Sequence, residues 1–271
     1  MKKNRVGICH ICGNHKELTF EHIPPKSVFN ADNVRLYQYI DIHAAGNDCW
    51  DFSGVRYKQH QRGVGGYTLC EQCNNDIGAW YVVDYADFII RLYSAIKKHS
   101  FKQNDEFVVY ANDIYPLRIF KSILAMFCSL NSDKFVDMHN IRKMLLNREE
   151  KGVAGDYGIA MYFAIGNIIK QLPISVIAST DTHNFTSTIR TVSEITWFPF
   201  GYIFDAKREN NPRDFDITDF SQYGYDEKAD ISIELITREV NTPFPVDFRS
   251  KKQVIEQRNA TLSAKKGETS D

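Results

Sequence analysis

The chain reads CHIC at residues 9–12, TFEHIPP at residues 19–25 and GGYTLCEQCNN at residues 65–75. Two Cys-x-x-Cys pairs therefore bracket an acid-histidine pair, and each cysteine pair places two thiolates on one tight turn. Two such turns brought together form a tetrahedral four-sulfur site with no open position, which is a structural rather than a catalytic arrangement. Four soft ligands of one type favour zinc over hard cations. The predicted ligands of one structural zinc ion are Cys9, Cys12, Cys70 and Cys73.

The order of these motifs resembles that of the HNH, or ββα-metal, endonucleases, in the subtype braced by a four-cysteine zinc site. In that family the first cysteine pair precedes a strand that ends in acid-His-Ile/Val-x-Pro. A second strand then leads to a Cys-x-x-Cys that opens a helix, with His or Asn next. These positions are occupied here by EHIP at 21–24 and CEQCN at 70–74. The resemblance covers the first third of the chain and implies that strands at 18–20 and 67–69 form the hairpin of a ββα unit.

The resemblance also implies catalytic roles. His22 would be the general base that takes a proton from water, which then attacks a phosphodiester. Glu21, where family members often have Asp, would bind a single divalent ion, with Asn74 as its second ligand and Asn75 as the alternative to Asn74. Carboxylate and amide oxygens are hard donors, so we expect Mg²⁺ or Mn²⁺, which would stabilise the charge that develops on the phosphate. Asn74 also suits a helix cap, and the two roles can coexist.

An insertion at residues 26–66 interrupts the predicted hairpin and is longer than a usual loop. Its segment 56–62 (RYKQHQR) is the best local basic patch, and we expect it to contact phosphate near the active site. A solvated loop is the alternative interpretation of this segment. The family's middle asparagine, which orients the base histidine, has Asn47 as its candidate by position alone. The predicted nucleic-acid contacts are Lys26, Arg56, Lys58 and Arg62.

The composition is that of a packed globular protein without a global basic field. The chain has 271 residues, of which 43% are apolar and 13% aromatic, and its formal net charge is −1. No apolar run follows the charged start, and none is long enough to span a bilayer, so we expect neither a signal peptide nor membrane contact. Matched cysteine pairs then indicate metal binding in a reducing compartment rather than disulfides. We therefore expect a soluble, cytoplasmic protein.

The predicted fold class is α+β. Residues 1–99 would form the zinc-braced ββα-metal unit, ending in a long amphipathic helix that Gly78 breaks in two. Residues 100–248 would form a mixed helical and antiparallel-sheet domain for specificity, partner binding or dimerisation, and the polar residues 249–271 a disordered tail. The expected helices of this second part are 116–130 and 133–147, and its expected strands are 106–111, 157–165, 174–179, 185–191, 195–204 and 231–236.

The leading functional hypothesis is a metal-dependent HNH endonuclease that hydrolyses DNA, with restriction, phage defence or a mobile element as possible settings. Its partners would be the DNA backbone and, through the second half of the chain, a protein or a second copy. The alternative is a zinc-stabilised module that binds nucleic acid or protein without catalysis; the net charge and the unplaced middle asparagine favour it. A redox role for the Cys-x-x-Cys pairs fits poorly, because two pairs around one acid-histidine pair are not the thioredoxin arrangement.

Overall fold

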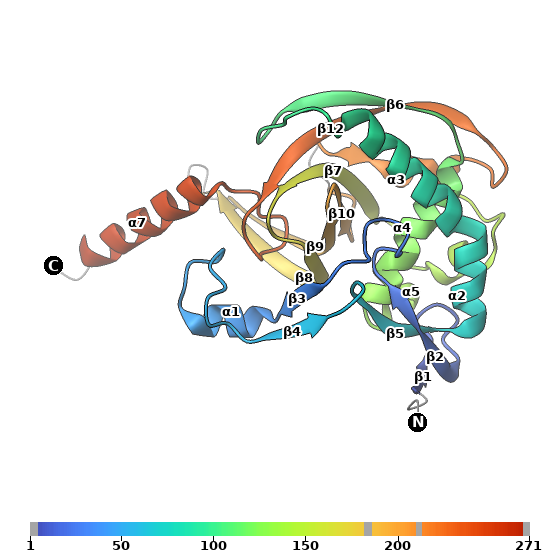
Figure 1. Ribbon diagram of the computed structural model, residues 1–271, viewed down its shortest axis with the longest axis horizontal. Helices are drawn as coiled ribbons and strands as arrows, with labels where there is room; N and C mark the ends of the chain where they lie inside the picture. The colour runs from blue at the N-terminus through green and yellow to red at the C-terminus, as the bar shows by residue number, and fades with distance from the viewer. Residues whose placement is uncertain (1–4, 182–185, 210–212, 268–271) are drawn as a thin grey trace.

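The computed structural model describes residues 5–181, 186–209 and 213–267 (Figure 1). Within these residues the strands form a three-stranded sheet, a two-stranded sheet and a seven-stranded sheet, with helices packed between them. The mixed α and β content agrees with the fold class expected from the sequence. No described helix is long and apolar enough to cross a lipid bilayer.

The three-stranded sheet contains β1 (Val6–Ile8), β2 (His15–His22) and β5 (Gly65–Cys70), antiparallel in the order β1-β2-β5. Helix α2 (Glu71–Ile77) follows β5 directly, with Cys70 as its N-cap residue. The strands expected at 18–20 and 67–69 and the helix expected after Cys73 are therefore confirmed as secondary structure. A Cβ atom at the start of β5, on Gly65, would lie 1.9 Å from a carbonyl oxygen of β2, so glycine permits this close pairing.

Gly78 does not break the helix that follows. It starts a π-helical turn, Gly78–Val82, which leads into α3 (Val83–Ile96). Gly78 has ordinary right-handed backbone angles (φ −59°, ψ −47°), because the buried apolar stripe of α3 stabilises the helix more than one glycine costs. Tyr81 in the π-helical turn and Phe88 on α3 are both fully buried.

The insertion has secondary structure that the sequence analysis did not foresee. Strands β3 (Val34–Tyr37) and β4 (Tyr57–His60) pair as a separate two-stranded sheet, with α1 (Tyr39–Ala45) between them. The rings of Tyr37 and Phe52 stack at a centroid distance of 4.6 Å. These strands have four residues each, VRLY and YKQH, which is too short for a clear two-residue alternation.

The seven-stranded sheet has the order β6-β12-β7-β10-β9-β8, with β11 also paired to β7. It is mixed rather than purely antiparallel, because β12 runs parallel to β7 and antiparallel to β6. Strand β12, the last long strand of the chain, thus lies between β6 and β7, and the hydrophobic pattern of the separate strands does not predict this order. The strand bounds are β6 (Glu106–Ile114), β7 (Gly158–Gly166), β8 (Lys170–Asp181), β9 (Thr186–Trp197), β10 (Phe200–Asp205), β11 (Phe215–Asp216) and β12 (Ala229–Val240).

Helix α4 (Pro116–Leu130) is buried nearly all round and packs among the sheets and helices. The helix expected at 133–147 is two short helices, α5 (Phe135–Met138) and α6 (Arg142–Leu146), because Asn140 between them has a positive φ of 55°. One hydrophobic cluster joins residues on both sides of the expected boundary at residue 99. It includes Cys9, Leu69, Phe120, Phe127 and Phe204.

The structure differs from the expected disordered tail, because α7 (Lys251–Gly267) follows residue 250. At its start the Ser250 hydroxyl accepts a hydrogen bond from the Gln253 backbone N–H, and the Gln253 side chain accepts one from the Ser250 backbone. This reciprocal pair of hydrogen bonds is a capping box, which favours a helix start. The prediction of a disordered tail used the polar composition alone and did not consider this motif. The helix also carries Arg258, which forms an ion pair with Asp48 of the insertion.

Candidate metal centre and the residues around His22

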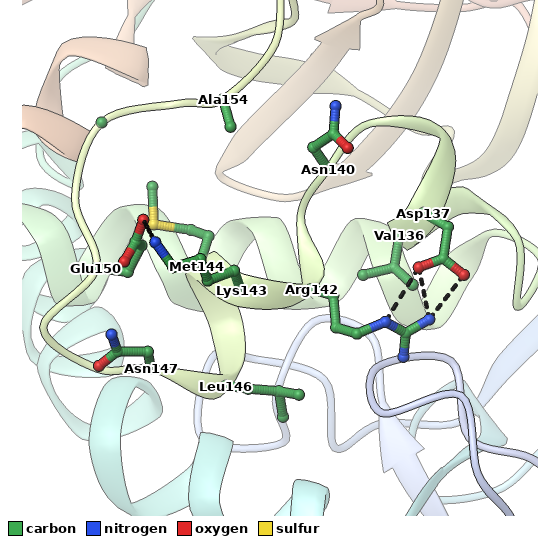
Figure 2. A pocket seen from close by; sticks show the side chains of 11 residues that line it. Val136, Asp137, Asn140, Arg142, Lys143, Met144, Leu146, Asn147, Glu150 and Ala154 are labelled. Carbon is green, nitrogen blue, oxygen red and sulfur yellow. Dashed lines mark hydrogen bonds and ion pairs between the residues drawn. The ribbon is translucent and has the colours of Figure 1, made fainter.

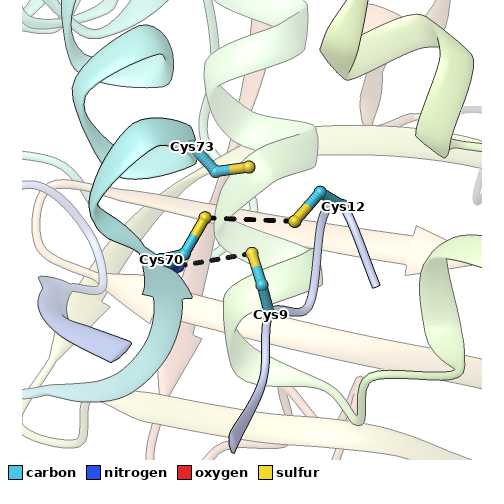
Figure 3. Close-up of side chains that lie close together, drawn as sticks. All are labelled: Cys9, Cys12, Cys70 and Cys73. Carbon is cyan, nitrogen blue, oxygen red and sulfur yellow. Dashed lines mark hydrogen bonds between the residues drawn. The ribbon is translucent and has the colours of Figure 1, made fainter. Parts of the chain in front are cut away.

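The four predicted zinc ligands come together (Figure 3). Cys9 and Cys12 lie in the turn between β1 and β2, Cys70 ends β5, and Cys73 lies in the first turn of α2. Their Sγ atoms lie within 4.8 Å of one another, and Cys12 and Cys70 are separated by 3.9 Å. A tetrahedral site with Zn–S bonds of about 2.3 Å places its sulfurs about 3.8 Å apart. The cluster can therefore hold one zinc ion.

The charge balance of the four thiols also suits a cation. A hydrogen bond from the Cys73 thiol, together with backbone N–H groups such as that of Cys70, lowers the pKa of Cys9 to about 4. The same hydrogen bond to Cys9, followed by burial, raises the pKa of Cys73 well above its ordinary value. Four thiolates this close together repel one another, and a bound divalent ion would take the place of their protons.

The cysteine cluster is attached to the second half of the chain. Arg142 of α6 forms an ion pair with Asp137 at 2.6 Å, at the edge of the surface cavity drawn in Figure 2. Its other guanidinium nitrogen donates a hydrogen bond to the Ile11 carbonyl, between the first two cysteines. His10 Nδ1 lies 3.1 Å from the Cys128 carbonyl of α4, so the His10 ring is engaged away from the four sulfurs.

His22 ends β2, and a backbone contact indicates the tautomer of its neutral ring. Its Nε2 lies 3.0 Å from the Arg62 carbonyl oxygen. A carbonyl oxygen can only accept a hydrogen bond, so Nε2 carries the proton and donates. In the neutral ring Nδ1 is then the unprotonated nitrogen, which is the form that a general base needs.

Asn30, a residue that the sequence did not single out, fixes the backbone next to Arg62. Asn30 is fully buried, and its amide nitrogen donates to the carbonyls of Pro24 (2.7 Å) and Val64 (2.8 Å). Its Oδ1 accepts from the Val64 backbone N–H at 2.8 Å. Gly63 has a φ of +92°, and a Cβ there would lie 2.3 Å from the Asn30 carbonyl oxygen. Asn30 thus ties the end of β2 to the loop that orients His22.

Asn47, the candidate by position for the middle asparagine, has a local role instead. Its amide donates to the carbonyls of Asp51 (3.3 Å) and Ser53 (2.9 Å) in its own loop. The only sequence signal for Asn30 is an amide in a stretch whose neighbours include Val28 and Phe29. That signal is too weak to identify a positioning residue without the tertiary contact.

Glu21 and Asn74 both adjoin the face of β2 that carries Thr19. The Asn74 amide nitrogen donates to the Thr19 hydroxyl at 2.9 Å, which leaves its Oδ1 available as an acceptor. Burial raises the pKa of Glu21 to about 7, and its carboxylate has no hydrogen bond or ion pair with any described residue. Successive residues of a strand point to opposite faces, so Glu21 and His22 leave β2 on opposite sides. Asn75 is exposed on α2.

The four predicted phosphate contacts are all exposed, and none forms an ion pair among the described residues. The structure places one of them, Arg62, next to His22, because the Arg62 carbonyl accepts a hydrogen bond from the His22 ring. Lys58 lies on β4, where its charge is a secondary cause, after burial, of the lowered pKa of His60. Among the described residues, no hydrogen bond or ion pair joins Lys26, Arg56 or Lys58 to His22.

Comparisons with protein-family models, with curated proteins and with solved structures found no match to this chain.

Proposed function

We propose that the chain is a metal-dependent endonuclease of the HNH type that hydrolyses phosphodiester bonds in DNA. The observation that carries the proposal is the His22 ring, whose Nε2 proton is held by the Arg62 carbonyl so that Nδ1 is free to accept a proton. The buried Asn30 amide, which bonds Val64 two residues after Arg62, supports the proposal because it fixes the loop that carries the partner of His22.

The reaction is a hydrolysis. His22 Nδ1 takes a proton from water as the water oxygen forms a bond to phosphorus, the bond to the 3′-oxygen breaks, and the leaving oxygen takes a proton from solvent. Glu21 and Asn74 offer the hard oxygen donors for Mg²⁺ or Mn²⁺. When bound, such an ion supplies charge neutralisation at the phosphate and at the leaving oxygen. The four-cysteine cluster has a structural role in this proposal and takes no part in the reaction.

The first prediction concerns His22→Ala. Plasmid and single-stranded DNA should be cut by the unmodified protein with Mn²⁺ or Mg²⁺, but not in EDTA, and the variant should lose activity by about 100-fold or more because it lacks the base. His15→Ala is the matched control, since His15 is exposed at the other end of β2. If His22→Ala cuts as well as the unmodified protein, His22 is not the base.

One observation favours the second candidate, a zinc-stabilised binding module without catalysis. The Asn74 amide is used to tie α2 to Thr19, which is a structural role. This candidate predicts nucleic-acid binding without cutting under Mn²⁺, and equal binding by the unmodified protein and His22→Ala.

A further inference from the structure

Two large exposed aromatic rings lie near the end of β2: Phe20, whose ring contacts His22, and Tyr67, whose ring contacts Phe20. Phe20, two residues earlier on the same face of β2, is 36% exposed, and Tyr67, its cross-strand partner on β5, is 40% exposed. The Phe20 ring packs edge-on against His22 at a centroid distance of 4.9 Å and against Tyr67 at 5.3 Å. Neighbouring exposed rings at a proposed catalytic residue indicate a surface that binds something apolar and flat.

Cations flank these rings. The Arg5 guanidinium lies 4.0 Å above the centroid of Tyr67, and Lys16 lies on the same face of β2 as Phe20, four residues earlier. Neither of these cations has an ion pair with a described residue, and no acidic residue lies on this face of β2. We name this surface the aromatic face and define it by Arg5, Lys16, Phe20 and Tyr67.

We infer that the aromatic face binds unpaired nucleotides, whose bases stack on Phe20 and Tyr67 while their phosphates meet Arg5 and Lys16. The inference rests on the proposed function and narrows its substrate to single-stranded nucleic acid. Bases in a duplex have both faces covered by their neighbours, so contact with an aromatic ring requires an unpaired base. Exposed aromatics interleaved with a few cations are the usual basis of single-strand binding.

The net charge of the chain also favours single-stranded over double-stranded nucleic acid as the ligand of the aromatic face. Affinity for a duplex comes mainly from many phosphate contacts, whereas this chain has a net charge of −1 and few cations on the aromatic face. Stacking needs no such field, because every base has a flat face. A base on Phe20 also brings its own phosphate next to His22, the proposed general base, whereas Glu21 and Asn74 lie on the other side of β2.

The test measures equilibrium binding in the His22→Ala background without Mg²⁺ or Mn²⁺, so that no probe is cut. The probes are fluorescent oligothymidylate, oligouridylate and a DNA duplex, and the first two separate DNA from RNA as the source of unpaired nucleotides. We expect tighter binding of a single strand than of the duplex. Phe20→Ala and Tyr67→Ala should each weaken single-strand binding by roughly 5- to 150-fold.

Matched variants separate stacking from packing. Tyr67→Phe and Phe20→Tyr keep a ring and should retain the affinity, whereas Phe20→Leu keeps an apolar side chain without a ring and should lose it. Tyr110→Ala on β6 is the surface control, since Tyr110 is 74% exposed and distant in sequence from the hairpin. The ring-retaining variants keep the test decisive even where an alanine variant unfolds.

Two results would overturn the inference: a duplex bound as tightly as the single strands, or Phe20→Leu binding like the parent. Either would leave the nuclease proposal standing, because plasmid cleavage by the unmodified protein measures that activity separately. Single-strand binding that depends on Phe20, by a protein that cuts nothing with Mn²⁺, would reject the nuclease and leave the aromatic face established.

Discussion

At the scale of single residues, the orientation of the His22 ring depends on backbone contacts that lead from Arg62 through Val64 to Asn30. Asn30 makes three hydrogen bonds through one amide, two of them to Val64, and Val64 lies two residues after the carbonyl that His22 meets. A buried amide satisfied on both sides holds its neighbours rigidly, because breaking any one bond leaves an unpaired polar group inside the protein. In the proposed nuclease Asn30 would therefore position His22 without touching the substrate.

This role predicts the behaviour of Asn30→Leu. The variant leaves the Val64 N–H and the Pro24 carbonyl without partners, whereas the Val64 carbonyl keeps the Ile23 N–H. The free energy of unfolding should therefore fall by about 2–4 kcal/mol in urea titrations. Cleavage at a temperature where the variant is folded should show a lower kcat with an unchanged KM, because His22 loses its orientation but the surface that binds substrate is intact. Asn47→Ala is the control and should change neither quantity. A folded Asn30→Leu variant with normal kcat would show that His22 is oriented without Asn30.

At the scale of elements, the sequence predicted what has strong local periodicity. The strand at 106–111 and the helix at 116–130 are confirmed, since β6 and α4 contain them. The four cysteines were predictable because their spacing encodes geometry directly. Asn30 was not, because its partners are the backbone groups of distant residues. The small sheet of the insertion was missed for a similar reason, since its stability comes from packed rings such as Tyr37 and Phe52.

Helix α4 carries an element-scale prediction through Lys121. This lysine is fully buried and donates to the carbonyls of Asn147 (2.9 Å) and Arg148 (2.8 Å) in the segment after α6. Burial lowers its pKa from 10.5 to about 8, so between these values the unfolded chain binds a proton that the folded chain lacks. The free energy of unfolding should therefore rise with pH across this window, by about 2–3 kcal/mol from this group.

The measurement compares urea unfolding of the unmodified protein and Lys121→Met across that window. The free energy of unfolding of the unmodified protein should rise relative to that of Lys121→Met as pH rises, because methionine does not titrate. Lys143→Met on α6 is the control, since the Lys143 side chain is 75% exposed. Parallel pH curves for the unmodified protein and Lys121→Met would contradict the lowered pKa.

At the scale of the whole molecule, the cysteine cluster belongs to the main core. Cys9, Cys70 and Cys73 lie in the same hydrophobic cluster as α4 and the seven-stranded sheet, and Arg142 joins the turn of the first two cysteines to α6. The sequence could not show this, because the cysteine motifs and α4 are separate in the chain and have no shared pattern. Loss of the metal should therefore destabilise residues well beyond the first third of the protein.

The last prediction tests that coupling. Metal analysis should find about one zinc per chain, and Cys70→Ser should lower the free energy of unfolding by more than about 4 kcal/mol, because metal binding is part of the folding energy. Hydrogen exchange should then speed up in α4 as well as in β2 and β5. Cys49→Ser, whose sulfur lies outside the cluster, should leave both properties unchanged. If the exchange of α4 amides stays slow while the hairpin opens, the two halves fold independently despite their shared core.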